Sequence, residues 1–330
     1  MIVAITTRGH ADTLASISDG TFGCTVPKFV LDCYDRLLVA KRVRRATYVF
    51  TDLERLAPWE LRGAGELFQA LTEQGLRCLN NPAYAKSRVE LLRALHTAGI
   101  NPFNVYRAEE ATKPTRFPVL LRHEDDHWTP NRNLLQTQDE LDRELAHLRV
   151  GGVPLRGILV IEFCGEPYSD TLWHKWGTFR VGSTVTLDHL SVDDNWLVKR
   201  GDWNKFTEAA VADEHEAVKS NRFADDLKPV FELAGIEFGR ADHALVGDKT
   251  VVYEINTNPY IHPYVQDRKV LRRETALASR KRLAAALDAI DTPEKGMVTL
   301  RRTTFMKRQR RKWKLGPIPW RIGRTSLRRP

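Results

Sequence analysis

Four polar side chains in the last third of the chain have types and a spacing that can hold a metal ion: Arg240, Asp242, Glu254 and Asn256. The segments 238–246 and 250–256 have the composition of two β-strands, and 247–249 lies between them as a polar turn. If those three residues form the turn, the two carboxylates oppose each other and the arginine opposes the asparagine. Because side chains alternate along a strand, all four then project from one face of the hairpin.

Two opposed carboxylates repel each other unless a positive charge lies between them. A divalent cation removes this conflict, and Asp, Glu and Asn supply the oxygen ligands that Mg²⁺ prefers. The pattern therefore predicts that Asp242, Glu254 and Asn256 hold Mg²⁺ or Mn²⁺, with Arg240 beside the ion to stabilise a transferred phosphoryl group. A polar hairpin without a metal is the alternative, because a two-residue turn would shift the register by one and separate the four groups.

Strand-like and helix-like patterns alternate through the first 79 residues, which favours a parallel α/β layer. Strands are expected at 2–5, 46–50 and 76–79, and helices at 29–39 and 59–74. No G-x-G-x-x-G follows the first strand and no G-x-x-x-x-G-K-[ST] occurs, so neither a dinucleotide fold nor a P-loop is supported.

The rest of the chain reads as two mixed segments and a tail. Asn80-Asn81-Pro82 resembles a helix start, and Gly182-Ser183 resembles the turn of a second hairpin. The expected domains are an N-terminal α/β domain, a small and a large α+β subdomain, and a basic tail, at 1–79, 80–156, 157–294 and 295–330.

Basic residues gather at the C-terminal end of the chain. The formal net charge is +9, but the segment 295–330 contains 13 Lys and Arg and no Asp or Glu, leaving a mildly acidic body of 38 basic and 42 acidic side chains. A nucleic-acid groove across the body is therefore not expected. The mixture of cations and tryptophans in this tail predicts contact with an anionic membrane surface or a polyanion. The alternative is a tail whose tryptophans pack back on the body of the protein. The sequence has neither a signal-peptide pattern nor a long apolar run, so a cytoplasmic location is expected.

Several short motifs occur in the order in which ATP-grasp enzymes carry them, and the chain resembles the branch of RimK-type and D-alanine–D-alanine ligase-type carboxylate–amine ligases. The resemblance covers about 80–287. The motifs are, in chain order, Lys86 before Val89–Leu92 and Gly99-Ile100, then Phe117–Arg122, Ile161–Phe163, Lys175, Phe179–Gly182, Gly239–Asp242 and Glu254–Pro259.

The resemblance implies an α/β (α+β) ATP-grasp fold with the nucleotide site between two α+β subdomains. It also implies a MgATP-dependent ligase that joins a small-molecule or peptide carboxylate to an amine through an acyl phosphate. ATP would be held by five residues: Lys86, Arg122, Glu162, Phe163 and Lys175. Arg240 and Arg180 would stabilise the acyl phosphate and its tetrahedral successor.

Two departures from the family pattern concern the phosphate side of the site. Arg122 stands where the family has a lysine, which replaces a point charge with a planar fork. The following loop, 123–132, has three acids and no glycine, so Glu124, Asp125 and Asp126 would have to point away from a nucleotide. We expect this loop to act as a lid that excludes water. Two other functions stay open: a nucleotide-binding pseudoenzyme or scaffold recruited through its basic tail, and an ATP-grasp phosphotransferase.

Overall fold

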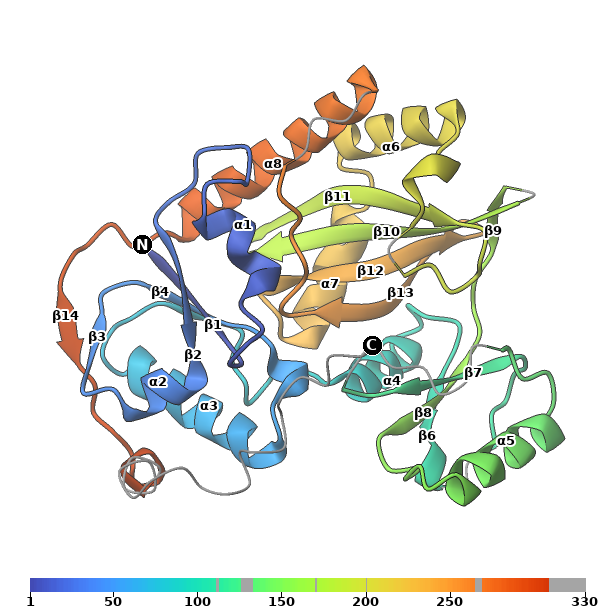
Figure 1. The fold of residues 1–330 in the computed structure, drawn as a ribbon, viewed down its shortest axis with the longest axis horizontal. Coiled ribbons are helices and arrows are strands. Elements are labelled where there is room, and N and C mark those ends of the chain that lie inside the picture. The colour runs from blue at the N-terminus through green and yellow to red at the C-terminus, as the bar shows by residue number, and fades with distance from the viewer. Residues whose placement is uncertain (111–112, 126–132, 170, 200, 265–268, 309–330) are drawn as a thin grey trace, which may run out of the picture.

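The computed structural model describes residues 1–308 except 111–112, 126–132, 170, 200 and 265–268. In this part of the chain there are three sheets of three to five strands and a two-stranded ribbon of β3 (Arg42–Arg44) and β14 (Met297–Thr299) at the outer edge of the molecule (Figure 1). The small sheet, the large sheet and the N-terminal domain contribute residues to a central cavity. Among the described residues, no helix is both long enough and apolar enough to cross a lipid bilayer.

The N-terminal sheet is entirely parallel, in the order β2-β1-β4-β5. Along β1, Ile2 and Ala4 pack in the cluster that contains α1 and α8 residues, whereas Val3 and Ile5 pack in the cluster that contains α2 and α3 residues. Burial on both faces explains why β1 is continuously apolar. The elements are β1 (Ile2–Thr6), α1 (Ala15–Ser18), β2 (Phe29–Cys33), α2 (Tyr34–Val39), β4 (Thr47–Phe50), α3 (Pro58–Thr72) and β5 (Cys78–Leu79).

The small sheet is antiparallel, in the order β6-β8-β7. One face packs on α5 through Leu141 and Leu148, and the other turns Leu120 and Ile161 toward the cavity. Because β8 is the central strand, this sheet extends to Glu162; the domain limits themselves stay a prediction. The elements are α4 (Arg88–Thr97), β6 (Val105–Arg107), β7 (Val119–His123), α5 (Gln138–Val150) and β8 (Ile158–Glu162).

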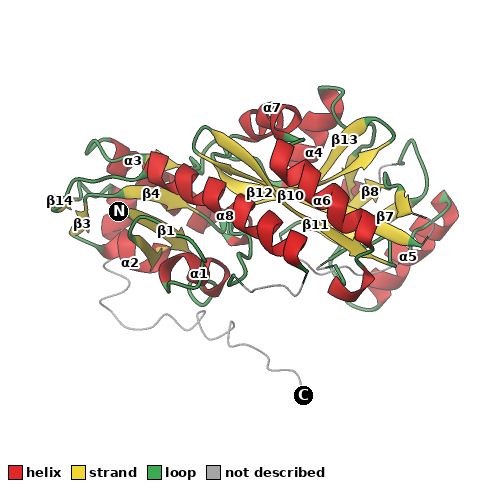
Figure 2. Cartoon of the chain, turned by 90° about the horizontal axis from the view of Figure 1, so that it is seen from above, coloured by secondary structure: helices red, strands yellow, loops and turns green. Residues whose placement is uncertain are grey.

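The large sheet is antiparallel, in the order β11-β10-β12-β13, with β9 paired to β10. Helices α6 and α8 lie along β11, and α7 lies behind the sheet (Figures 1 and 2). The elements are β9 (Pro167–Ser169), β10 (Leu172–Val181), β11 (Thr184–Asp193), α6 (Glu208–Ser220), α7 (Ala224–Ala234), β12 (Phe238–Val246), β13 (Lys249–Asn256) and α8 (Val270–Ile290).

Two predicted helices are corrected by the structure. The segment 29–39 is not one helix, because its aromatic and β-branched half pairs with β1 as β2 before α2 begins. Asn80 does not open a helix. It lies in the left-handed region (φ 61°), and its buried amide bonds backbone groups of Phe50, Glu237 and Phe238, which ties the N-terminal sheet to the large sheet.

The start of the basic tail packs on the N-terminal domain. Strand β14 (Met297–Thr299) pairs with β3 (Arg42–Arg44), and both Leu300 and Met306 are buried. The predicted α/β (α+β) fold with a parallel N-terminal sheet is confirmed.

Candidate active site

The hairpin β12–β13 places its four polar groups as the sequence predicts. Asp242 lies opposite Glu254, and Arg240 lies opposite Asn256. The neighbouring strand β10 continues the first of these rows with Gly177, which pairs with Asp242. All four side chains line the central cavity.

The turn that produces this register differs from the predicted one. Val246 pairs with Lys249, so the turn has two residues, 247–248, and the predicted three-residue turn is wrong. The register then shifts between Asp242 and His243, where Tyr253 is the extra residue of a β-bulge. The bulge cancels the slip that a two-residue turn introduces, and it allows the consecutive residues Tyr253 and Glu254 both to line the cavity.

The buried carboxylate of Asp242 is held between two cations. Its Oδ2 lies 2.9 Å from Nζ of Lys175, and its Oδ1 accepts a hydrogen bond from Nε of Arg240 at 3.1 Å. Burial raises the pKa of Asp242, and the neighbouring Glu254 does so too, but the charges of Lys175 and Arg240 outweigh both and hold the pKa below its usual value. Asp242 therefore stays ionised and able to ligate a cation.

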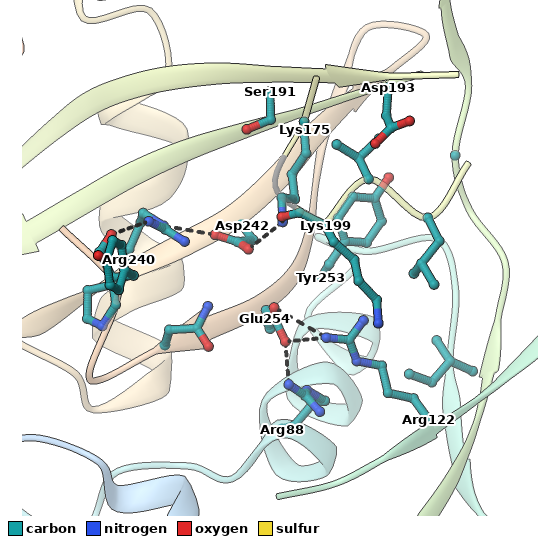
Figure 3. Close-up of a pocket in the computed structure, with 18 of the residues that line it drawn as sticks. Arg88, Arg122, Lys175, Ser191, Asp193, Lys199, Arg240, Asp242, Tyr253 and Glu254 are labelled. Atoms are coloured by element: carbon teal, nitrogen blue, oxygen red, sulfur yellow. Dashed lines mark hydrogen bonds and ion pairs between the residues drawn. The ribbon is translucent and has the colours of Figure 1, made fainter. Parts of the chain in front are cut away.

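Glu254 is also held by two cations. Arg88 forms an ion pair with it, and Nη2 of Arg122 lies 3.2 Å from its Oε2 (Figure 3). Nε of Arg122 is buried and has no hydrogen-bond partner among the described residues. Together with Lys175 and Arg240, these arginines give the site four cations around two carboxylates, a surplus of positive charge that suits a polyanion such as a triphosphate.

The cavity has a volume of about 990 Å³, and its lining comes from the small sheet, from the large sheet and from the segments that follow β1 and β4 in the N-terminal domain. Beside Arg122, its wall becomes apolar and aromatic, through Leu92, Phe103, Leu120, Ile161, Phe163 and Trp196. An apolar slot beside a cluster of cations matches the two halves of a nucleotide, whose base is flat and whose phosphates are charged.

Glu162 and Phe163 lie at this slot, as predicted, but the acid has a different environment from the expected one. Its carboxylate accepts hydrogen bonds from Asn104 N and Tyr106 Oη, both at 2.9 Å, and from the 115–116 segment. Burial raises the pKa of Glu162, but these donors outweigh it and lower the pKa. The acid therefore fixes the wall of the slot, which Phe163 lines directly after it.

Two predicted residues are not brought to the cavity. Arg180 follows Phe179, which pairs with Arg240, so alternation places Arg180 on the opposite face of the sheet, where its Nε donates to the carbonyl of Gly182. Lys86 precedes α4 and is absent from the cavity lining. Lys175 and Arg122, by contrast, both line the cavity.

Arg88 lines the cavity and pairs with Glu254, and the sequence reasoning did not single it out. Ser87 and Glu90 form a capping box, in which Ser87 N donates to Oε2 of Glu90 at 2.8 Å. The box starts α4 at Arg88 and projects it toward Glu254. The Ser-x-x-Glu pattern is visible in the sequence and could have identified this helix start.

We expected the acids of the predicted lid to point away from the cavity, and of the two that the structure describes, Glu124 does so and Asp125 does not. The carboxylate of Glu124 points away from the cavity and forms two hydrogen bonds with the guanidinium of Arg107, at 2.6 and 3.1 Å. Asp125 lines the cavity. The remainder of the loop, 126–132, lies outside the described residues.

The oxygen donors of the hairpin fit a magnesium ion by type. Asp242, Glu254 and Asn256 provide two charged and one neutral oxygen ligand on one face. No group of three or more His, Cys, Asp or Glu in the described part of the chain could hold a metal, so the amide is needed as the third protein ligand. Phosphate oxygens and water would complete such a site.

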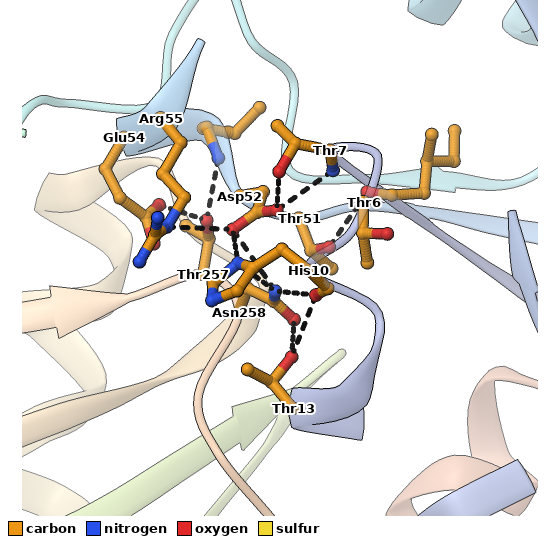
Figure 4. A network of polar contacts seen from close by, with 12 residues as sticks. Thr6, Thr7, His10, Thr13, Thr51, Asp52, Glu54, Arg55, Thr257 and Asn258 are labelled. Carbon is orange, nitrogen blue, oxygen red and sulfur yellow. Dashed lines mark hydrogen bonds and ion pairs between the residues drawn. The ribbon is translucent and has the colours of Figure 1, made fainter. Parts of the chain in front are cut away.

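A second polar cluster adjoins the hairpin at the N-terminal domain. Asp52 is fully buried, and its backbone has a left-handed conformation (φ 61°). Its carboxylate accepts hydrogen bonds from Thr7, His10 and Asn258 (Figure 4). The sequence reasoning did not single out this cluster, because it joins three segments that are far apart in the chain.

No protein-family model matches the chain, and no curated protein matches it by sequence. Solved structures with a similar fold include a RimK domain protein ATP-grasp from Sphaerobacter thermophilus, with 18% identity, a TM-score of 0.47, and 88% of this chain and 99% of that chain covered. A D-alanine–D-alanine ligase from Bacillus anthracis complexed with ATP has 10% identity, a TM-score of 0.49, and coverage of 88% and 97%.

An L-amino acid ligase from Bacillus licheniformis has 11% identity, a TM-score of 0.39, and coverage of 78% of this chain and 66% of that chain. All three TM-scores are below 0.5 and all three identities below 25%, so these likenesses say nothing of the activity. The observed order of a parallel sheet, a small antiparallel sheet and a large sheet with an acidic hairpin is consistent with the ATP-grasp fold that the sequence resemblance implies.

Proposed function

We propose that the chain binds ATP with a divalent cation in the central cavity and joins a carboxylate to an amine, releasing ADP and phosphate. One observation carries the proposal: two opposed carboxylates lie among four cations beside an apolar slot, in a cavity between the small sheet, the large sheet and the N-terminal domain. The charged part suits a metal-bound triphosphate, and the slot suits adenine.

The chain's own residues divide the work between binding and activation. Arg88, Arg122 and Lys175 would bind phosphate oxygens, and Phe163 would contact the base. Asp242, Glu254 and Asn256 would hold Mg²⁺ or Mn²⁺, which neutralises phosphate charge when bound. Arg180 has no place in this proposal.

The reaction is written in two steps. An oxygen of the substrate carboxylate attacks the γ-phosphorus, and ADP leaves with the electron pair of the broken bond. The amine then attacks the carbonyl carbon of the acyl phosphate, phosphate leaves, and the nitrogen loses a proton to give the amide. Arg240, which pairs with Asp242 at the edge of the acidic pair, would stabilise the anionic acyl group in both steps.

The test measures ADP release by the full chain with Mg²⁺ and ATP, screened against pooled amino acids, peptides and amines. We expect release that requires both an acid and an amine. Nucleotide binding without release in any pool would favour the pseudoenzyme instead. Release that needs no amine, with a phosphorylated acid as the product, would favour the phosphotransferase.

We propose in addition that the basic end of the chain contacts an anionic membrane surface of a cytoplasmic compartment. Strand β14 pairs with β3, which brings the basic residues in and around these two strands together. Eight of them are exposed and make no ion pair with the described residues: Lys41, Arg42, Arg44, Arg45, Lys295, Arg301, Lys307 and Arg308. Full-length chain should sediment with vesicles containing phosphatidylserine and not with pure phosphatidylcholine, and Arg42→Glu with Arg44→Glu should weaken this. Binding to RNA but not to vesicles would contradict it.

A further inference from the structure

The imidazole of His10 lies between a buried carboxylate and the cavity. Its Nδ1 is 2.6 Å from Oδ1 of Asp52, which is 0% exposed. The other oxygen, Oδ2, accepts hydrogen bonds from Thr7 N at 2.9 Å and from Thr7 Oγ1 at 2.6 Å. The carboxylate is therefore fixed on both sides, and it fixes the ring in turn.

Asn258 connects this pair to the metal-binding hairpin. Its Nδ2 donates to Oδ1 of Asp52 at 3.1 Å and to the carbonyl of His10 at 3.0 Å, while its Oδ1 accepts from Thr13 Oγ1 at 2.8 Å (Figure 4). Asn258 is two residues beyond Asn256, so their Cα atoms are at most about 7 Å apart. The pair is thus held next to the site where the acyl phosphate would form.

The hydrogen bonds determine which ring nitrogen carries the proton. Burial raises the pKa of Asp52, but the hydrogen bonds from His10 and Thr7 outweigh it and lower the pKa, so the carboxylate is ionised and can only accept. Nδ1 of His10 must then be the donor, which leaves Nε2 with a lone pair. The side chain of His10 is 25% exposed and lines the cavity.

Two acids and one cation lie near His10. Asp12 and Glu54 line the cavity, and Oε2 of Glu54 accepts a hydrogen bond from Thr257 Oγ1 at 2.6 Å, while burial raises the pKa of Glu54. Arg55 is turned toward Asp52, with its Nε 3.7 Å from Oδ1 of that residue. Another Asp-paired histidine, His189, also lines the cavity. Its imidazole is bonded to Asp188 and lies beside the side chain of Arg240. A Cβ atom added to Gly177 would lie 2.8 Å from Cε1 of His189 and 3.1 Å from Cδ of Arg240, so the two side chains share one space. His189 therefore lies on the Arg240 side of the cavity, where an anion would bind.

We propose that His10, positioned by Asp52, is the general base of the amine step and that the acceptor arrives as an ammonium ion at the end of the cavity that Asp12 and Glu54 line. This proposal rests on the proposed ligase function. Nε2 takes one proton from the ammonium. The freed nitrogen lone pair attacks the acyl carbon, phosphate leaves with the bonding electrons, and the second nitrogen proton passes to solvent or to phosphate.

The experiment compares two nucleophiles in the full chain, with MgATP and the pooled standard amino acids as carboxylates. Amide formation uses the amines of the pool, whereas added hydroxylamine is uncharged near neutral pH and needs no base. We expect His10→Asn, which keeps a donor for Asp52 but removes Nε2, to lower amide formation by about 100-fold or more while hydroxamate formation changes only a few-fold. Asp52→Asn should also lower amide formation far more than hydroxamate formation, because an amide at this position no longer holds the proton of His10 on Nδ1.

His189→Asn is the matched control and should not separate the two rates. Equal loss of amide and hydroxamate in His10→Asn, or no loss of either, would overturn the proposal. Wild-type protein that forms neither product would instead refute the ligase function itself. Independently of any substrate, nitrogen-15 spectra of wild type should show Nδ1 of His10 protonated and Nε2 bare, and the opposite tautomer would also overturn it.

Discussion

Removal of Arg88 gives the sharpest test of the nucleotide site. Its side chain is 10% exposed, and its guanidinium forms an ion pair with Glu254 and donates through Nη1 to the carbonyls of His123 at 2.6 Å and Glu124 at 3.1 Å. It is thus oriented on two sides toward the place where phosphate would bind. Lys86, two residues earlier, does not line the cavity, and its backbone N–H bonds the carbonyl of Ala234.

The expected loss follows from one charged hydrogen-bonding group. A hydrogen bond to a charged group contributes about 1.5–3 kcal/mol, so Arg88→Ala should raise the Kd for the magnesium complex of a non-hydrolysable ATP analogue by about 10- to 150-fold. Lys86→Ala is the matched control and should leave the Kd unchanged. Arg88→Lys should fall between wild type and Arg88→Ala, because it keeps the charge and loses the fork.

The assay is calorimetric titration of each variant, with a thermal melt to establish that the variant is folded. The melt is needed because Arg88 also holds the loop that follows β7. An unchanged Kd in folded Arg88→Ala would refute the assignment of Arg88. An equal loss in Lys86→Ala would return that role to the residue predicted from the sequence.

Three further outcomes are expected. Glu254→Gln should abolish Mg²⁺-dependent ADP release while the circular dichroism spectrum is retained, and surviving turnover would remove Glu254 from the metal site. Burial lowers the pKa of His243 to about 3 in the folded chain. Below about pH 6.5 His243 takes up a proton in the unfolded chain but not in the folded one, so its contribution to the free energy of unfolding should fall by about 1.4 kcal/mol per pH unit until the pH reaches the folded-state value. Urea titrations at several pH values check this, with a smaller slope for His243→Gln and the same slope for exposed His147→Gln. Deleting 297–330 should lower the free energy of unfolding by about 3–6 kcal/mol more than deleting 309–330, because Leu300 and Met306 are buried, and equal losses would contradict this.

Local patterns predicted the parts of the site that local geometry determines. The alternation of side chains placed Asp242 and Glu254 together, and the strand patterns located β7, which contains Arg122, and β8, which Phe163 follows directly. These features depend on residues that are neighbours in the chain or across one hairpin.

The errors concern pairings between distant segments. Arg180 could not be assigned to a face until the register of β10 with β12 was known, and that register joins residues about sixty positions apart. The strand β2 was taken for helix because its apolar spacing fits both periods, and only parallel pairing with β1 decides between them. The cluster of His10, Asp52 and Asn258 is of the same kind, since no short pattern contains it.

The bulge at Tyr253 explains how a wrong turn led to the right register. A two-residue turn at Gly247 and Asp248 gives pairs that differ by one from those of a three-residue turn. Without compensation, this slip would have placed the two carboxylates on opposite faces. The extra residue, Tyr253, restores the pairing of Asp242 with Glu254. Its side chain also contacts the cavity wall, since Tyr253 Oη donates a hydrogen bond to the carbonyl of Cys164 at 2.9 Å. The bulge therefore couples the apolar wall of the cavity to the position of Glu254, so Tyr253→Phe should disturb the slot and leave the opposition of Asp242 and Glu254 intact.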